Sequence, residues 1–274
     1  MSIRQLCSTL QVNRRWYYAR LAQGEPVDPE VELRDAIEQI ILDFSGYGYR
    51  RVTHALVRAG WSVNHKRVLR IMREESLLCH LTRQFVPTTD SHHPFQVYPN
   101  LVKGLEVDAP DLVWVADITY IRLPSSFVYL AALLDAYSRK CVGWNLSQRI
   151  DTHLALGALE QALATREVRP GLIHHSDRGV QYASTAYVER LLSVAARISM
   201  SALGNLYDNA KAESFFKTLK QEEVYLKHYQ TFEEAHTNIG QFIEEVYNTK
   251  RLHSSLGYLP PIEFEMAYAQ GLRC

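Results

Sequence analysis

The sequence has few cysteines and no apolar run that could span a membrane. Its 274 residues include 4 cysteines, Cys7, Cys79, Cys141 and Cys274, with no Cys-x-x-Cys pair. This spacing excludes a disulfide framework and a cysteine zinc site, so we expect reduced thiols. No uncharged stretch approaches the roughly 20 apolar residues of a membrane helix. Residues 1–5 also lack the apolar stretch of a secretory signal, and we therefore expect a cytoplasmic protein without membrane contact.

Net charge is absent as well, but the charges are unevenly distributed. The 30 Lys and Arg residues balance 30 Asp and Glu residues. Residues 44–73 nevertheless carry seven Lys or Arg and no acidic residue, and residues 1–20 carry four Arg and no acidic residue. With 47% apolar and 22% charged residues the chain can bury a core, which excludes wholesale disorder. Basic stretches of this kind indicate a polyanion as binding partner.

The first 79 residues are predicted to form short helices. Apolar residues at helical spacing predict helices at 3–10, from residue 14, and at about 28–44, 49–58 and 64–75. In the third of these we expect Asp28 as N-cap, Pro29 as first residue, and a buried stripe of Val31, Ile37, Ile40, Ile41 and Phe44. In the fifth we expect Asn64 as N-cap and Val68, Leu69 and Met72 facing inward.

The basic residues of this region share helix faces. Lys66, Arg70 and Arg73 follow the spacing i, i+4, i+7. A solvated basic face is the ordinary alternative, but residues 44–73 contain no acidic counter-charge, so we favour contact with DNA. We interpret residues 1–79 as a helix-turn-helix-like DNA-binding region and assign its DNA contacts to Arg50, Arg51, Lys66, Arg67, Arg70 and Arg73.

The remainder of the chain is predicted to be an α/β unit. Residues 80–106, including the His92-His93 pair, show no periodicity and predict a linker. Three β-rich runs predict an antiparallel meander, at 113–121, 127–134 and 140–146. Alternating elements follow: a helix at 152–165, a strand at 171–175, a helix at 184–194, a strand at 196–200 and a helix at 207–223. This order is that of a ribonuclease-H-like core, a mixed five-stranded sheet flanked by helices, over residues 107–225. Residues 226–274 predict a helical C-terminal extension with a stop at Pro260-Pro261.

Three carboxylates lie in unusual surroundings. Asp117 is inside an apolar strand, where a half-buried carboxylate is costly without a compensating cation or donor. Asp177 directly follows the apolar 171–175 run, at a strand end where α/β sheets bind ligands. The third, Glu213, lies in the predicted helix at 207–223. Each has an ordinary explanation: Asp117 as a hydrogen-bonded structural residue, Asp177 as a turn or cap residue, and Glu213 as part of a surface Glu–Lys pair. Together, two strand ends and a facing helix can bring carboxylates to a pair of Mg²⁺ ions.

The sequences that flank these carboxylates resemble those of a known family. The relevant segments are WVADITYI (114–121), LLDAYSRKCVGW (133–144), HHSDRGVQYAS (174–184), GNLYDNAKAESFFKTLKQE (204–222) and YNTKRLHSSLGYLPPIEFE (247–265). They resemble the DDE transposases of bacterial insertion sequences, in particular the second-reading-frame protein (OrfB) of insertion-sequence family three, and the related retroviral integrases. Thirty-five residues separate Asp177 from Glu213, which is the spacing of that family.

The resemblance implies Mg²⁺-dependent cleavage and transfer of DNA strands at the ends of an element. It assigns catalysis to Asp117, Asp177 and Glu213, which would hold two Mg²⁺ ions, or Mn²⁺ in their place. It also assigns contacts with the DNA end to Lys217 and Lys220. Water would attack first and the freed 3′ hydroxyl second. The implied partners are double-stranded DNA at the terminal repeats and at the target, and an upstream-frame OrfA protein. Because two DNA ends must be held together, we also expect a homo-oligomer on DNA, in the cytoplasm at the nucleoid.

Two alternatives remain open at this point. The chain could be a non-catalytic DNA-binding or regulatory subunit of a transposition complex. It could also be a ribonuclease-H-type nuclease acting on hybrids, although a sequence-reading basic region would then be superfluous. We expect His174 and His175 to be packed strand-end residues, and Ser176 lacks the His and Asp partners of a serine nucleophile.

Overall fold

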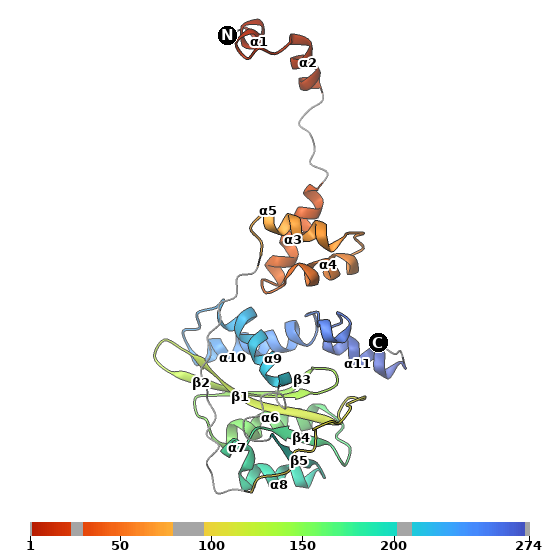
Figure 1. The fold of residues 1–274 in the computed structure, drawn as a ribbon. Coiled ribbons are helices and arrows are strands. Elements are labelled where there is room, and N and C mark those ends of the chain that lie inside the picture. Colours follow the sequence, from red (N-terminus) through yellow and green to blue (C-terminus); the bar gives the residue numbers. More distant parts are fainter. Residues whose placement is uncertain (1, 23–29, 79–95, 202–209, 272–274) are drawn as a thin grey trace.

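The structure is a computed structural model that describes residues 2–22, 30–78, 96–201 and 210–271 (Figure 1). The predicted cap Asp28, the first helical residue Pro29, the pair His92-His93, and Cys79 and Cys274 lie outside these residues. Cys7 and Cys141 are buried free thiols. In the described part of the chain, no helix is long and apolar enough to cross a membrane.

The N-terminal part is helical, as predicted. It comprises α1 (Ile3–Thr9), α2 (Arg14–Ala22), α3 (Val31–Asp43), α4 (Tyr49–Arg58) and α5 (His65–Glu74). Asn64 caps α5, because its side chain accepts the Lys66 N–H at 2.8 Å. Helices α3, α4 and α5 pack around one apolar core, formed by Leu33, Ile37, Tyr47, Val52, Leu56, Val68, Ile71, Met72 and Leu252. The last of these residues comes from the C-terminal part of the chain.

The predicted buried stripe of α3 is wrong at its first position. Val31 is exposed, whereas Leu33, which was not predicted, is buried together with Ile37. Residues two apart point to nearly opposite sides of a helix, so Val31 and Leu33 cannot share the inward face. The stripe therefore begins at Leu33 and continues through the partly buried Ile40 and Phe44.

A mixed five-stranded sheet forms the centre of the second part. Its strands are β1 (Val113–Arg122), β2 (Phe127–Asp135), β3 (Cys141–Ser147), β4 (Ile173–Ser176) and β5 (Arg197–Met200), in the order β3-β2-β1-β4-β5. The first three strands pair antiparallel, and β4 and β5 join β1 in parallel. The predicted meander and the ribonuclease-H-like core are thereby confirmed.

Helices cover both faces of this sheet (Figure 1). On one face lie α6 (Thr152–Thr165), α7 (Val180–Ala183) and α8 (Thr185–Ser193), and on the other α9 (Ala210–Leu219) and α10 (Phe232–Gln241). Strand β1 is buried from both sides, because Trp114 packs into the core beneath α6 while Val113 and Val115 pack into the core beneath α9. The alternation puts Asp117 on the α9 face of the sheet.

Two helices of the C-terminal half change their winding. Helix α9 continues as the π-helix η1 (Lys220–Val224), and α10 continues as the π-helix η2 (Phe242–Tyr247). A 3-10 turn, η3 (Ser254–Leu256), and α11 (Pro261–Ala269) follow. The predicted stop at Pro260-Pro261 is instead the start of α11, with Pro261 in its first turn, where the missing N–H costs no hydrogen bond.

Candidate active site

Asp117 and Asp177 come together through the register of two parallel strands. The last residue pair of β1 and β4 is Ala116 with Ser176. Asp117 and Asp177 directly follow this pair in sequence, and the charge of Asp177 acts on Asp117, so these two carboxylates lie near each other. The convergence of all three carboxylates on a metal stays a prediction.

The charge of Asp117 is strongly influenced by its surroundings. Burial, followed by the negative charges of Asp177 and Glu213, raises the pKa of the Asp117 carboxyl to about 8. The backbone N–H of Ile118, which donates to Oδ1 at 2.8 Å, and the Lys220 cation act in the opposite direction. Asp177 and Glu213 therefore each lie within electrostatic reach of Asp117.

Glu213 lies in a helix, and Asp177 lies in a turn that precedes one. Glu213 is an exposed residue in the first turn of α9, whose opposite face buries Phe215 and Phe216 in the core against the sheet. Asp177 accepts the N–H of Gly179 at 2.9 Å, a local turn that leads directly into α7. Helix α7 was not predicted, since its four residues are too few for a periodic pattern.

The carboxylate donors determine which metal this site could hold. Among the residues that the structure describes, no three His, Cys, Asp or Glu side chains are placed closely enough to hold a metal ion. The register thus joins Asp117 and Asp177, while Glu213 acts on them at longer range. The donors are carboxylate oxygens only, and burial, followed by repulsion from Asp177 and Glu213, makes the ionisation of Asp117 costly. This donor set fits a hard divalent cation such as Mg²⁺, which would neutralise that repulsion.

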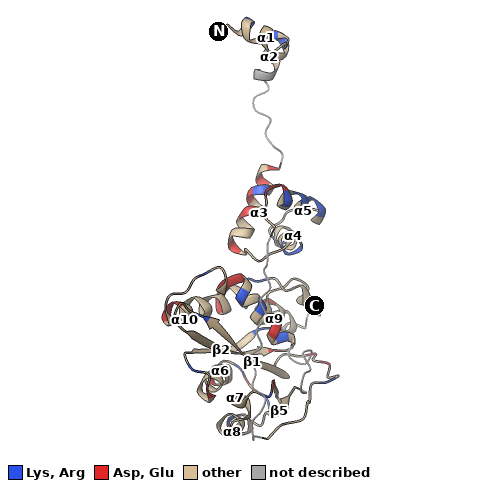
Figure 2. Ribbon diagram, turned by 60° about the vertical axis from the view of Figure 1, so that its left-hand side comes forward, with Lys and Arg blue, Asp and Glu red and all other residues tan. Residues whose placement is uncertain are grey.

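Lys220 lies beside the carboxylates. Its Nζ is 4.7 Å from the centre of the Tyr120 ring, a cation–π contact that sequence reasoning missed. Burial lowers the pKa of Lys220, and the charge of Asp117 partly restores it. Lys217, one turn earlier on α9, is exposed. Both lysines are thus on the same helical stretch as Glu213. Figure 2 shows acidic and basic residues together in the region of α9.

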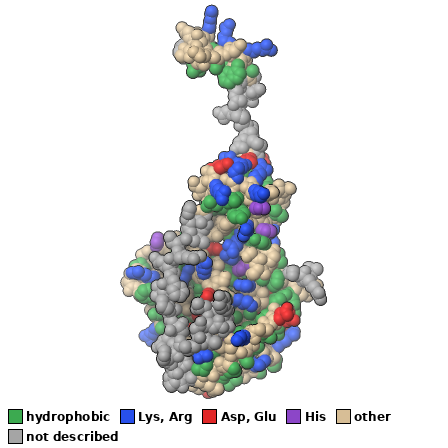
Figure 3. Space-filling view, viewed as in Figure 1, with side chains coloured by type: hydrophobic (Ala, Val, Ile, Leu, Met, Phe, Trp, Pro, Cys, Tyr) green, Lys and Arg blue, Asp and Glu red, His purple; other side chains and the backbone are tan. Residues whose placement is uncertain are grey.

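The predicted DNA-binding residues of α5 are exposed but not free of acidic neighbours. Glu30 accepts hydrogen bonds from Arg67 at 2.8 Å and from Arg70 at 2.6 Å, and Arg70 also pairs with Glu74 at 2.9 Å. The expectation that these cations have no acidic counter-charge nearby is therefore wrong. Residues 44–73 contain no acidic residue, but Glu30 and Glu74 lie next to them in the folded protein. Figure 3 displays acidic and basic side chains together on this part of the surface. Lys66 and Arg73 are exposed as well.

Arg50 and Arg51 differ in their surroundings. Arg50 is exposed and its guanidinium lies 5.5 Å from the centre of the Tyr49 ring. Arg51 is half-buried, and its guanidinium lies 5.7 Å from the centre of the Tyr47 ring. Burial, and then the cation of Arg251, lowers the pKa of Arg51. Arg51 therefore faces the C-terminal segment, unlike the open surface expected of a DNA contact.

The two strand-end histidines are packed inside the protein, as expected. The imidazole of His174 bonds the hydroxyl of Tyr187 at 2.8 Å, and that of His175 lies between Ser199 and Ser201, at 2.8 and 3.1 Å. Both are fully buried. Burial, followed by the charge of His175, lowers the pKa of His174 to about 3. Both side chains therefore support β4 rather than reach a substrate.

Tyr182 is a second residue that sequence reasoning missed. Its ring is buried next to Asp177, and among the described residues its hydroxyl has no hydrogen-bond partner. Burial raises the pKa of Tyr182, and the charges of Asp117 and Asp177 contribute. The only sign of Tyr182 in the sequence was its position five residues after Asp177, within the segment HHSDRGVQYAS.

Three parts of the chain match known families. Residues 107–205 and residues 194–261 each match a family described as "Integrase core domain". Residues 29–85 match a family described as "HTH-like domain". These matches cover both the helical part α3–α5 and the sheet that carries Asp117 and Asp177.

Several proteins are similar over almost the whole chain. The transposase for insertion sequence element IS904 of Lactococcus lactis is 39% identical over 248 residues, which are 90% of this chain and 98% of that protein. The transposase InsF for insertion sequence IS3A of Escherichia coli is 34% identical, over 96% of this chain and 94% of that protein. A 31 kDa protein of the insertion element IS600 from Shigella sonnei is 36% identical, over 97% and 99%.

Solved structures of integrases are similar to this chain at low sequence identity. A chain of the simian T-cell lymphotropic virus intasome has a TM-score of 0.48 and 16% identity, covering 84% of this chain and 74% of that chain. The HTLV-2 integrase catalytic core domain in complex with magnesium has a TM-score of 0.44 and 14% identity, covering 57% and 97%.

Proposed function

Because the chain belongs to the insertion-sequence transposases that carry an integrase core domain, we propose that Asp117, Asp177 and Glu213 are its catalytic residues. The enzyme class is that of DDE transposases and integrases, which cleave DNA strands and transfer them. The observation that carries the residue assignment is the parallel register of β1 and β4, which makes Asp117 and Asp177 neighbours. The influence of Glu213 on the charge of Asp117 supports its inclusion.

The three carboxylates would hold the metal, two Mg²⁺ ions or Mn²⁺ in their place. When bound, the ions would activate the attacking oxygen and stabilise the leaving oxygen of a phosphodiester. The protein itself would contribute positioning, because Asp117 lies in the central strand β1, Asp177 directly follows the neighbouring strand β4 and Glu213 lies in the covering helix α9. The Lys220 ammonium, held over Tyr120 next to Asp117, would pair with a phosphate beside the scissile bond.

The reaction proceeds in two displacements in this proposal. Water attacks the phosphodiester at the end of the element, the bond to the 3′ oxygen breaks, and a free 3′ hydroxyl results. That hydroxyl then attacks a phosphodiester of the target, a new bond forms between its oxygen and the phosphorus, and the 3′ oxygen of the target strand leaves as a free hydroxyl. Two ends must be held together for this, so the partners would be terminal-repeat DNA, target DNA, further copies of the chain and an OrfA protein.

We assign the recognition of the DNA end to α3–α5. The exposed cations of this part are Arg50, Lys66, Arg67, Arg70 and Arg73. Four of them, from Lys66 to Arg73, belong to the single helix α5, and a row of cations along one helix can contact phosphates along a groove. DNA phosphates would compete with Glu30 for Arg67 and Arg70, since both arginine side chains are exposed.

The triad is tested by charge-neutral substitutions. Asp117→Asn, Asp177→Asn and Glu213→Gln should each lower Mg²⁺-dependent strand transfer by a factor of at least about 10³, while DNA affinity stays within about threefold. The matched control is Glu189→Gln, an exposed glutamate on α8, which should leave transfer unchanged. Labelled element ends and a target duplex, read on a gel, provide the measurement. Retained transfer in any triad variant would overturn the assignment.

The same assay separates the alternatives. End binding without cleavage, with Mg²⁺ and with or without OrfA, would support a non-catalytic DNA-binding subunit. Cleavage of an RNA–DNA hybrid in preference to the duplex would support a ribonuclease-H-type nuclease. We expect cleavage of the duplex end that disappears when the metal is chelated.

A further inference from the structure

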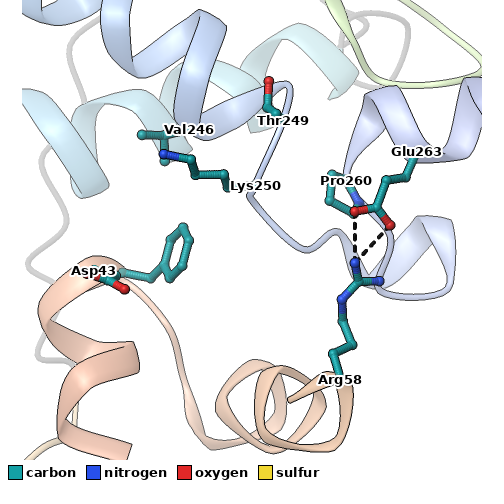
Figure 4. A pocket seen from close by; sticks show the side chains of 8 residues that line it. Asp43, Arg58, Val246, Thr249, Lys250, Pro260 and Glu263 are labelled. Carbon is teal, nitrogen blue, oxygen red and sulfur yellow. Dashed lines mark hydrogen bonds and ion pairs between the residues drawn. The ribbon is translucent and has the colours of Figure 1, made fainter. Parts of the chain in front are cut away.

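Helices α3–α5 pack directly against the C-terminal part of the chain. Leu252 is buried in their apolar core, and its backbone N–H donates to the Tyr47 hydroxyl at 2.8 Å. At the rim of the same contact, Arg58 pairs with Glu263 at 2.8 Å (Figure 4). An open cavity of about 550 Å³ lies beside this ion pair, between α3 and η2. The contact thus joins the end of α4 to the start of α11.

A stacked ring pair closes the other side of this contact. The rings of His54 and Tyr258 lie 3.6 Å apart, nearly parallel. Tyr258 has a φ of 63°, a left-handed conformation that is rare for a bulky side chain and costs on the order of 1 kcal/mol or more. The surrounding contacts must offset this cost, and the stacking on His54 is one of them.

The segment that makes these contacts is itself anchored to the sheet. Asn248 accepts the N–H of Cys141 at 2.9 Å and donates to the carbonyl of the same residue at 3.0 Å. Cys141 is the first residue of β3, and Asn248 is almost fully buried. This two-way hydrogen bond acts like a short piece of additional strand, so residues 248–263 are fixed to the catalytic core.

A buried ion pair lies at the centre of the contact. The guanidinium of Arg251 is 3% exposed and bonds both carboxylate oxygens of Glu222, at 2.7 and 2.6 Å. Such a bidentate pair has a defined geometry, and loss of either partner would leave a buried charge uncompensated. On the other side, Gly46 approaches Glu222 so closely that a methyl group there would overlap its side chain.

Glu222 also belongs to the helix that carries the third carboxylate. It lies in η1, which continues α9 without a break, nine residues after Glu213. The Glu222–Arg251 pair thus attaches the C-terminal segment to the same helical stretch that carries Glu213 and Lys220.

We propose that Glu222 and Arg251 are positioning residues that clamp the helix-turn-helix-like part onto the catalytic helix. We call the contacts of Gly46 and Tyr47 with Glu222, Arg251 and Leu252 the clasp. Through the clasp, DNA held by α3–α5 meets the carboxylates in one fixed register. The inference rests on the proposed function. It adds that the clasp determines which phosphodiester bond of the DNA end is cleaved. Successive phosphates of one strand are offset by about 3.4 Å along the axis of the duplex, so an axial displacement of that size presents the neighbouring bond.

The test compares two glycines of one loop in the full-length chain. Gly46→Ala places a methyl group against Glu222 and should force the clasp apart. Gly48→Ala is the matched control, because a methyl group at Gly48 meets nothing within 4 Å and its φ of -81° suits alanine. Neither residue belongs to the proposed triad or to α5. The probes are a labelled terminal-repeat duplex and an unrelated duplex of the same length, each with Mg²⁺ or Mn²⁺.

With Gly46→Ala, metal-dependent nicking of the unrelated duplex should stay within about twofold of the parent. On the terminal repeat, cleavage at the correct bond should fall about tenfold or more and spread over neighbouring bonds. Gly48→Ala should cleave like the parent. Accurate cleavage by Gly46→Ala would overturn the inference. Absence of metal-dependent nicking in the parent chain would overturn the proposed function, and this inference with it, so the two failures are distinguishable.

Circular dichroism and thermal melting check that each variant folds. Should Gly46→Ala fail to fold, Arg251→Lys decides instead, because it keeps the buried positive charge but loses the bidentate geometry. We expect the cleavage of this variant to spread in the same way, with unchanged nicking of the unrelated duplex. A parent-like pattern in a folded Arg251→Lys variant would equally contradict the clasp.

Discussion

His253 is a residue whose ionisation opposes folding. Its imidazole is buried beside Tyr247, and its Nε2 has no hydrogen-bond partner among the described residues. Burial, and then the cations of Arg251, Arg51 and Arg139, lowers the pKa of His253 to about 3. The folded protein therefore favours the neutral imidazole well below the pH at which a free histidine takes up a proton.

This environment predicts an acid-sensitive free energy of unfolding. Below about pH 6.5 the unfolded chain binds a proton at His253 that the folded chain does not, so stability is complete above pH 6.5 and falls towards pH 3. His253→Gln should reduce the slope between pH 6 and pH 5 by up to about 1.4 kcal/mol per pH unit. Urea unfolding at both pH values measures it, and only the change with pH is compared because Gln also alters packing.

An equal pH slope in the parent chain and in His253→Gln would contradict this account. It would mean that the imidazole is protonated in the folded protein, or that its site opens before the chain unfolds.

Single residues differ in how far the sequence alone could predict them. Asp117 and Asp177 were accessible because each interrupts or ends an apolar strand, and because their flanking residues resemble a known family. Arg51 was not, since nothing in the run Tyr49-Arg50-Arg51 distinguishes the exposed arginine from the half-buried one. Tyr182 was missed because a buried hydroxyl becomes notable only when its surroundings are known.

At the scale of elements, α5 is a basic helix whose charges are partly occupied. Glu30 pairs with Arg67 and Arg70 across the start of α3, and the two arginine side chains are exposed. Exposed ion pairs contribute little to stability, about 0–1 kcal/mol each. They do reduce the positive field that the helix offers to a polyanion.

Removal of the Glu30 charge is therefore expected to strengthen DNA binding. In Glu30→Gln the two arginines become available to phosphates, so the affinity for a terminal-repeat duplex should rise several-fold. The slope of log K against log salt should become steeper by about one to two, because each additional phosphate that an arginine neutralises adds about one unit. Fluorescence anisotropy between about 50 and 200 mM salt gives both values.

The control for this measurement is Glu38→Gln, an exposed glutamate of α3. It should change affinity less than Glu30→Gln, since only the general charge is altered. Identical curves for the two variants would indicate that Arg67 and Arg70 do not contact DNA.

Elements were predictable where their period was clear. Strands β1, β2 and β3 and helix α6 were placed within one or two residues, because alternation and i, i+4 spacing extend over many positions. The four residues of α7 and the π-winding of η1 leave no periodic signal. The helix predicted at 207–223 begins outside the described residues and is observed from Ala210 onward.

At the scale of the whole molecule, α3–α5 and the catalytic core share one contact surface. It is built by residues 222 and 246–263, which follow the carboxylates in sequence but lie between the two parts in space. The segment YNTKRLHSSLGYLPPIEFE thereby receives a structural role. No local pattern could have predicted the pairing of Glu222 with Arg251, because charges 29 residues apart are joined only by the fold.

The central claim is that Asp117, Asp177 and Glu213 bind the catalytic metal. Anomalous scattering from crystals of the chain with Mn²⁺ and a terminal-repeat duplex tests it most directly. We predict metal peaks at about 2.0–2.2 Å from carboxylate oxygens of Asp117 and Asp177, with Glu213 completing the ligands of one ion. A metal bound elsewhere, or Glu213 more than about 10 Å from a metal at Asp117 in the DNA complex, would contradict the account.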